Sequence, residues 1–136
     1  MIRSLLAVAL GYVVMLVAFL GAETALTALA PDLIPQKGRA TDSLYFVFQL
    51  TTGFFFIGIG GYVTALLAGR SEMKHALGLG ALSIAMSIVS RLQYPGDEPL
   101  WYSIALMFLA IPGALAGGYY RVRQMEDGKA HAATGD

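Results

Sequence analysis

A single arginine lies inside an apolar stretch of this sequence, at a position where a charge is costly. Arg91 belongs to SIAMSIVSRLQYPGDEPLWY, residues 83–102, and it comes before the apolar run is long enough to cross a lipid bilayer. A charge at such a depth needs an acidic partner, or its long side chain must reach the lipid head groups. Glu23 is the only acidic residue within an apolar stretch, so it is the candidate partner.

Other polar and aromatic residues are expected in or just above the same outer half of the membrane. Gln49 and Thr52 lie early in one apolar stretch, and Trp101 opens another. Three interpretations remain open: separate side chains that reach the head groups, a structural pair of Glu23 and Arg91, or an outward-facing polar pocket for a ligand or transported solute. A buried ion pair would fix the register of two helices more than it would add stability.

The sequence excludes several kinds of chemistry. It has no cysteine, which rules out thiol redox chemistry, iron–sulfur clusters and cysteine zinc sites. Its two histidines, His75 and His131, lie outside the apolar stretches, and a formal net charge of zero provides no basic field for nucleic acid. We therefore expect no catalytic residue, no metal and no cofactor, although an enzyme that acts on lipids stays open.

The composition indicates which elements must position these residues. Hydrophobic residues make up 57% of the 136 residues and charged residues only 13%, whereas a soluble domain has about 25% charged residues. A helix rises ~1.5 Å per residue, so about 20 residues cross the ~30 Å hydrocarbon layer of a membrane. Transmembrane helices are expected at about residues 4–30, 43–69, 74–94 and 99–122.

The third of these helices has the shortest apolar run. It crosses a membrane only if it continues through Arg91 to Tyr94, where a Pro-Gly pair predicts a turn. The sequence thus predicts an all-α, polytopic membrane protein, with an antiparallel bundle of four transmembrane helices in residues 1–123. Residues 124–136 are polar and are predicted to form a disordered cytoplasmic tail.

The distribution of basic residues predicts the orientation of the helices. Four spans would place both termini on the same side of the membrane. That side carries six of the nine basic residues, Arg3, Arg70, Lys74, Arg121, Arg123 and Lys129. The opposite side carries the other three, Lys37, Arg39 and Arg91. Because Lys and Arg are enriched in cytoplasmic segments, both termini are predicted to be cytoplasmic.

Small residues recur at helical spacing in all four apolar stretches and predict how the helices pack. Lipid chains are as apolar as leucine, so membrane helices associate where small residues let two backbones approach closely. The predicted packing glycines are Gly11, Gly61, Gly80, Gly113 and Gly117. They are expected to pack within the chain, and the alternative is a face for a partner or another copy. Pro112 predicts a bend in the last helix, static or acting as a hinge.

Several glycine-rich segments carry a resemblance to known proteins. GGYVTALLAGRSEMKHALGLG, followed by PLWY and IPGALAGGYYR, resembles a broad set of small bacterial inner-membrane proteins with four predicted spans. The resemblance implies the same architecture and a location in a bacterial inner membrane. It implies no activity.

Two kinds of function fit these features. The first is a structural or accessory membrane protein that packs through its small-residue faces against a larger complex or as a homo-oligomer. The second is a small transporter or ligand-binding membrane protein with an outward-facing polar site around Glu23 and Arg91. The lipid bilayer is the partner common to both.

Overall fold

Four helices account for most of the chain. The computed structural model describes residues 2–31, 43–69, 71–95 and 98–134. Its helices are α1 (Ile2–Leu29), α2 (Ser43–Ala68), α3 (Glu72–Gln93) and α4 (Leu100–Thr134), and no strand occurs in these ranges. All four helices are long and apolar enough to cross a membrane. The all-α prediction and the existence of four candidate spans are therefore confirmed.

The turn between α2 and α3 explains where those helices end. Gly69 has a φ of 67°, the left-handed conformation that terminates many helices at a glycine. Ser71 also has a positive φ, 54°, and immediately precedes α3. At its other end α3 continues through Arg91, and the backbone N–H of Tyr94 donates to the carbonyl of Ser90 at 2.9 Å. The 22 residues of α3 therefore extend ~33 Å, enough for one crossing.

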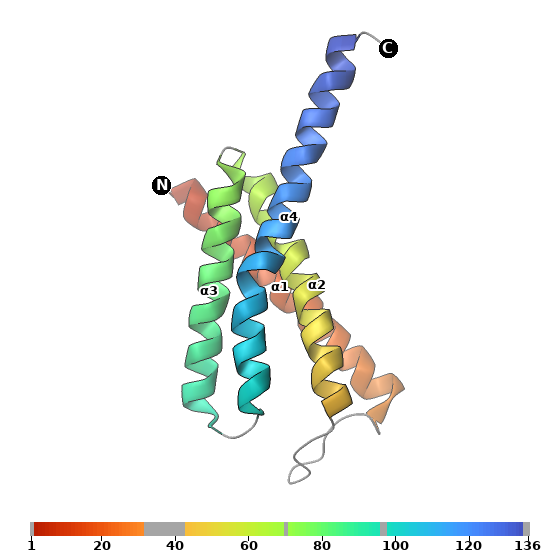
Figure 1. The fold of residues 1–136 in the computed structure, drawn as a ribbon, viewed down its shortest axis with the longest axis vertical. Helices are drawn as coiled ribbons and strands as arrows, with labels where there is room; N and C mark the ends of the chain where they lie inside the picture. Colours follow the sequence, from red (N-terminus) through yellow and green to blue (C-terminus); the bar gives the residue numbers. More distant parts are fainter. Residues whose placement is uncertain (1, 32–42, 70, 96–97, 135–136) are drawn as a thin grey trace.

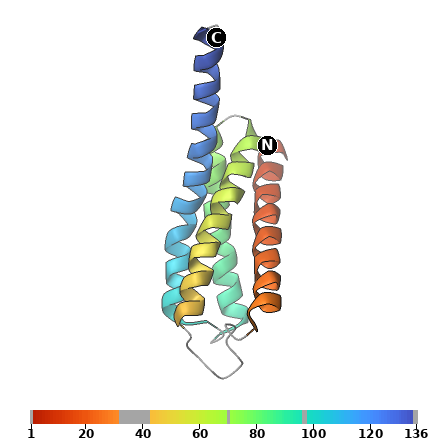
Figure 2. The same cartoon turned by 90° about the vertical axis from the view of Figure 1, so that its right-hand side faces the viewer.

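Figures 1 and 2 show how the helices lie along the long axis of the molecule. The N-terminus and the connection between α2 and α3 lie toward one end, and the connection between α3 and α4 lies at the other. Helix α2 packs against each of the other three helices. Helix α1 crosses behind the bundle at an angle in Figure 1, and it runs away from α3 toward its C-terminal end.

Helix α4 is longer than the sequence predicted. Residues 124–134, expected as a disordered tail, continue the helix to Thr134 and project beyond the other helices (Figure 2). This segment contains no proline, and its Gln, Met, Glu, Lys and Ala residues are strong helix formers. Pro112 lies inside α4 without ending it, and its side chain is exposed. A hinge at Pro112 stays a prediction.

The closest helix packing joins α2 and α4 through glycine. A Cβ atom added to Gly61 would overlap the backbone of Ala114, and one added to Gly117 would overlap the carbonyl of Gly58. Only residues without a Cβ permit this approach of two backbones. Gly113 lies on the same side of α4, where an added Cβ would overlap the side chain of Ile57.

The other predicted packing glycines join further pairs of helices. An added Cβ at Gly11 of α1 would overlap Thr64 of α2, and one at Gly80 of α3 would lie 3.0 Å from the Cα atom of Ile111 in α4. The core around these contacts consists of Ile57, Leu79, Ala110 and Ala114. All five predicted glycines thus face neighbouring helices of the same chain.

Candidate functional site

Glu23 belongs to a hydrogen-bonded cluster between α1 and α2. Its Oε1 atom accepts hydrogen bonds from the hydroxyl of Tyr45 and from Nε2 of Gln49, both at 2.7 Å. Nε2 of Gln49 also donates to the Tyr45 hydroxyl at 2.8 Å. Tyr45 and Gln49 are one helical turn apart, so both reach the same carboxylate. The acid is therefore held by neutral donors, and Gln49 is buried in the contact with only 8% of its surface exposed.

Arg91 has different partners, one on the connection between α3 and α4 and one in the first turn of α4. Its Nη1 atom donates to the carbonyl oxygen of Glu98 at 2.5 Å and to Oγ of Ser103 at 3.4 Å. Ser103 in turn donates to Oε2 of Glu98 at 3.5 Å. The proposed pairing of Arg91 with Glu23 is therefore wrong. The physical reason is that α1 diverges from α3 at this end of the molecule, whereas Glu98 follows Arg91 after a short connection (Figure 1).

Thr52 and Trp101 do not join either cluster. The hydroxyl of Thr52 donates to the carbonyl of Phe48 in its own helix at 2.8 Å. The ring of Trp101 packs edge-on against Phe46 and Tyr102, with centroid distances of 6.2 Å and 6.1 Å. Of the predicted polar residues, the structure thus brings together only Glu23 and Gln49.

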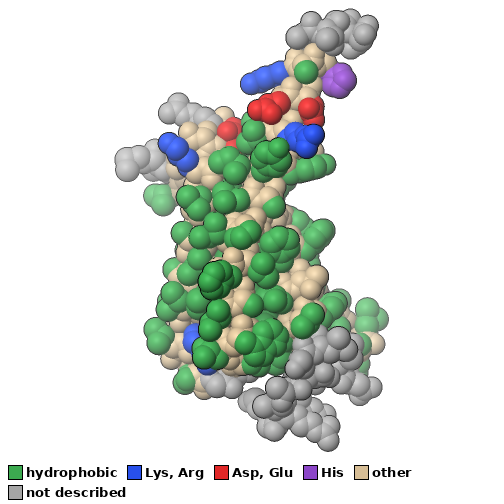
Figure 3. Space-filling model, in the orientation of Figure 1, with side chains coloured by type: hydrophobic (Ala, Val, Ile, Leu, Met, Phe, Trp, Pro, Cys, Tyr) green, Lys and Arg blue, Asp and Glu red, His purple; other side chains and the backbone are tan. Residues whose placement is uncertain are grey.

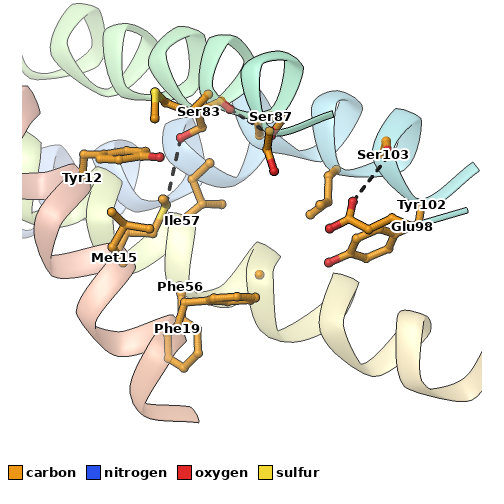
Figure 4. Close-up of a pocket in the computed structure, with 16 residues that line it drawn as sticks. Tyr12, Met15, Phe19, Phe56, Ile57, Ser83, Ser87, Glu98, Tyr102 and Ser103 are labelled. Atoms are coloured by element: carbon orange, nitrogen blue, oxygen red, sulfur yellow. Dashed lines mark hydrogen bonds between the residues drawn. The ribbon is translucent and has the colours of Figure 1, made fainter. Parts of the chain in front are cut away.

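A cavity of about 320 Å³ lies among all four helices, shown in Figure 4. This volume is at the lower end of the range for small-molecule sites, ~300–1,000 Å³. One wall is apolar and includes Met15, Phe19, Phe56, Ile57 and Leu106. The other wall is polar and includes Ser83, Ser87 and Ser90 of α3 with Glu98, Tyr102 and Ser103.

The polar wall offers mainly hydrogen-bond acceptors. The hydroxyl of Ser83 donates to the carbonyl of Leu79 at 3.0 Å, and the hydroxyl of Ser87 donates to the carbonyl of Ser83 at 2.9 Å. Each serine has a single hydroxyl hydrogen, which its own helix uses, so the oxygen lone pairs are left for another donor. The carboxylate of Glu98, which accepts from Ser103, also lines this wall. The wall therefore suits a molecule that donates hydrogen bonds.

In the sequence, the serines of α3 are small residues at helical spacing, a pattern that predicts helix packing rather than a cavity wall. Ser83 and Ser87 lie four residues apart and so share one face of α3. Met15 and Phe19 show the same spacing on α1. The sequence thus contained a row of residues on α1 and another on α3 that line the cavity. Their spacing alone does not reveal whether these two helices touch or separate.

Comparison of the chain with protein-family models, with curated proteins and with solved structures gives no match. The resemblance to four-span bacterial proteins therefore stays an expectation. Within the described ranges, no group of three or more His, Asp or Glu side chains could hold a metal ion. A second cavity, of about 580 Å³, lies between α2 and α4 and has a mainly apolar lining. Any function must be argued from the helices, the two polar clusters and these cavities.

Proposed function

We propose that this chain is a multi-pass membrane protein whose four helices form an antiparallel transmembrane bundle. The apolar surface supports this proposal, because large side chains such as Leu5, Phe55 and Phe108 are 72%, 67% and 78% exposed. Figure 3 shows apolar side chains over the middle of the molecule, with most charged groups near one end. Such a surface suits lipid and is disfavoured in water. The excess of basic residues on the side of the termini supports cytoplasmic termini and an inner-membrane location.

The function that the geometry supports best is binding of a small ligand in the cavity between the helices. The cavity itself carries this proposal, since it is lined by all four helices and combines an apolar wall with a polar one. The site differs from the one expected around Glu23 and Arg91, because these two residues belong to separate clusters.

Cysteine labelling tests the cavity directly, because the natural sequence contains no cysteine. Ser87→Cys is nearly isosteric and places a thiol in the cavity wall. In lipid nanodiscs we expect N-ethylmaleimide to modify it about tenfold faster than Thr64→Cys, since thiol reactivity follows accessibility. Thr64 is the matched control because it is 0% exposed in the contact between α1 and α2. Equally slow modification of both thiols would reject the binding proposal.

An accessory or self-associating role is a second candidate. One observation favours it: α1 is the least buried helix. In an apolar 18-residue segment of α1, 11% of the residues are buried, against 22–28% in the corresponding segments of the other helices. A Cβ added to Gly21 on this helix would meet nothing within 4 Å. A partner helix could cover that face, as lipid could. Particle mass in nanodiscs tests this role, and a single monomer mass after mild extraction would argue against it.

A further inference from the structure

The cavity opens sideways, between α1 and α3. Contact between these helices includes Val8 against Gly78 and Met15 against Ser83, where the sulfur and hydroxyl oxygen are 4.0 Å apart. Toward the C-terminal end of α1 the two helices separate (Figure 1). Leu16 of α1 and Met86 of α3, which line the cavity, are also 37% and 43% exposed.

This opening lies in the apolar part of the proposed spans. Leu16 is near the middle of α1 and Met86 is within α3. A water-soluble solute that entered here would have to leave water for the hydrocarbon layer, which is unfavourable for polar groups. A molecule that already resides in the membrane meets no such cost.

The two walls of the cavity specify the chemistry of the occupant. Phe19 and Phe56 face the cavity from α1 and α2, while Ser83 and Ser87 approach it from α3 (Figure 4). Because both serine hydroxyls donate to their own helix, an occupant that bonds to Ser83 or Ser87 supplies the donor. Glu98 is the one charged residue among the described residues that line the cavity, and its carboxylate repels an anionic head group, while the Arg91 guanidinium is held against the Glu98 carbonyl and the Ser103 hydroxyl.

From these observations we infer that the cavity binds the head of a membrane amphiphile that carries a hydroxyl or ammonium donor. Its hydrocarbon chain leaves through the gap between Leu16 and Met86 into the surrounding lipid. The cavity of about 320 Å³ holds the head and the first part of the chain. This inference rests on the proposed binding function and adds the ligand class and the position of the chain.

Protection of the Ser87→Cys thiol tests the ligand class. Nanodiscs containing this variant are supplied with 1-dodecanol, dodecylamine or dodecyl methyl ether at the same mole fraction of lipid, and N-ethylmaleimide modification is timed. We expect the alcohol and the amine to slow modification about fivefold more than the ether does, because the ether has no hydrogen-bond donor. A factor of about five corresponds to the net contribution of one hydrogen bond. Thr24→Cys, on the exposed surface of α1, is the control for effects of the probes on the membrane itself.

A second pair of variants tests the position of the chain. Leu16→Trp in the Ser87→Cys background fills the gap, so the alcohol is expected to lose most of its protective effect. Phe55→Trp is the matched control, because Phe55 is 67% exposed and does not line this cavity. Protection is expressed as the ratio of rates with and without alcohol in the same variant, so a change in basal reactivity cancels.

The outcomes separate this inference from the binding proposal. Equal protection by the ether overturns the donor head group, and unchanged protection in Leu16→Trp overturns the sideways exit of the chain. A reactive Ser87→Cys that glycerol protects and dodecanol does not would leave a cavity for water-soluble ligands and reject a membrane amphiphile. If Ser87→Cys is as unreactive as Thr64→Cys, both proposals fail.

Discussion

Replacement of Gly117 by alanine is expected to lower the free energy of unfolding by about 3 kcal/mol, at the upper end of the cost of overpacking. The added Cβ would overlap the carbonyl of Gly58 and lie 2.7 Å from the backbone nitrogen of Tyr62. These are backbone atoms of α2, so no side-chain rotation relieves the clash and the helices must separate. Reversible unfolding of the purified protein in mixed micelles measures the loss.

The matched control is Gly21→Ala on α1. Its added Cβ meets nothing within 4 Å, and alanine favours a helix over glycine by up to ~1 kcal/mol. We therefore expect unchanged or slightly raised stability. Similar losses for both variants would contradict the glycine-mediated contact between α2 and α4.

Replacement of Gln49 by leucine is expected to lower the free energy of unfolding by about 2 kcal/mol. The variant removes a 2.7 Å donor to the Glu23 carboxylate from a residue that is only 8% exposed. Hydrogen bonds to charged groups contribute about 1.5–3 kcal/mol, and the Tyr45 hydroxyl remains as the other donor to the same carboxylate oxygen. The same unfolding measurement quantifies the effect.

Two further variants separate this hydrogen bond from general packing. Glu23→Gln keeps an acceptor oxygen for both Tyr45 and Gln49, so it is expected to cost less than about 1 kcal/mol. The double variant Glu23→Leu/Gln49→Leu removes both partners and is expected to regain most of the stability lost in Gln49→Leu. Additive losses in the double variant would show that the two side chains do not interact.

The spans were predictable because each depends only on the length of a continuous apolar stretch in the sequence. Continuous apolar stretches identify helices that can cross a membrane, and Pro95 in the sequence indicates where α3 ends. The end of α4 was not predictable in this way. Loss of hydropathy after residue 122 marks the expected exit from lipid, but no proline follows, so the helix continues to Thr134.

The polar partners were not predictable, because they depend on how the helices cross. Residue counting places Glu23 and Arg91 toward the same outer surface of the membrane, yet it says nothing about the angle between their helices. The structure leads α1 away from α3, so Glu23 meets Gln49 of α2 and Arg91 meets Glu98. The same divergence opens the cavity. Predicting the divergence of α1 from α3 would require knowing in advance that Gly11 contacts Thr64 and that Gly61 contacts Ala114. These close contacts set the angles at which the helices cross.

The four-span arrangement, with the connection between α3 and α4 on the side opposite the C-terminus, is tested most directly by cysteine labelling from each side of the membrane. Tyr94 lies next to the end of α3 and is 61% exposed, and Ala132 lies on the exposed extension of α4. Each residue is replaced by cysteine in a separate variant. Right-side-out and inside-out vesicles are treated with a charged, membrane-impermeant maleimide. The account predicts modification of Tyr94→Cys only from outside and of Ala132→Cys only from inside; modification of both thiols from the same side would contradict it.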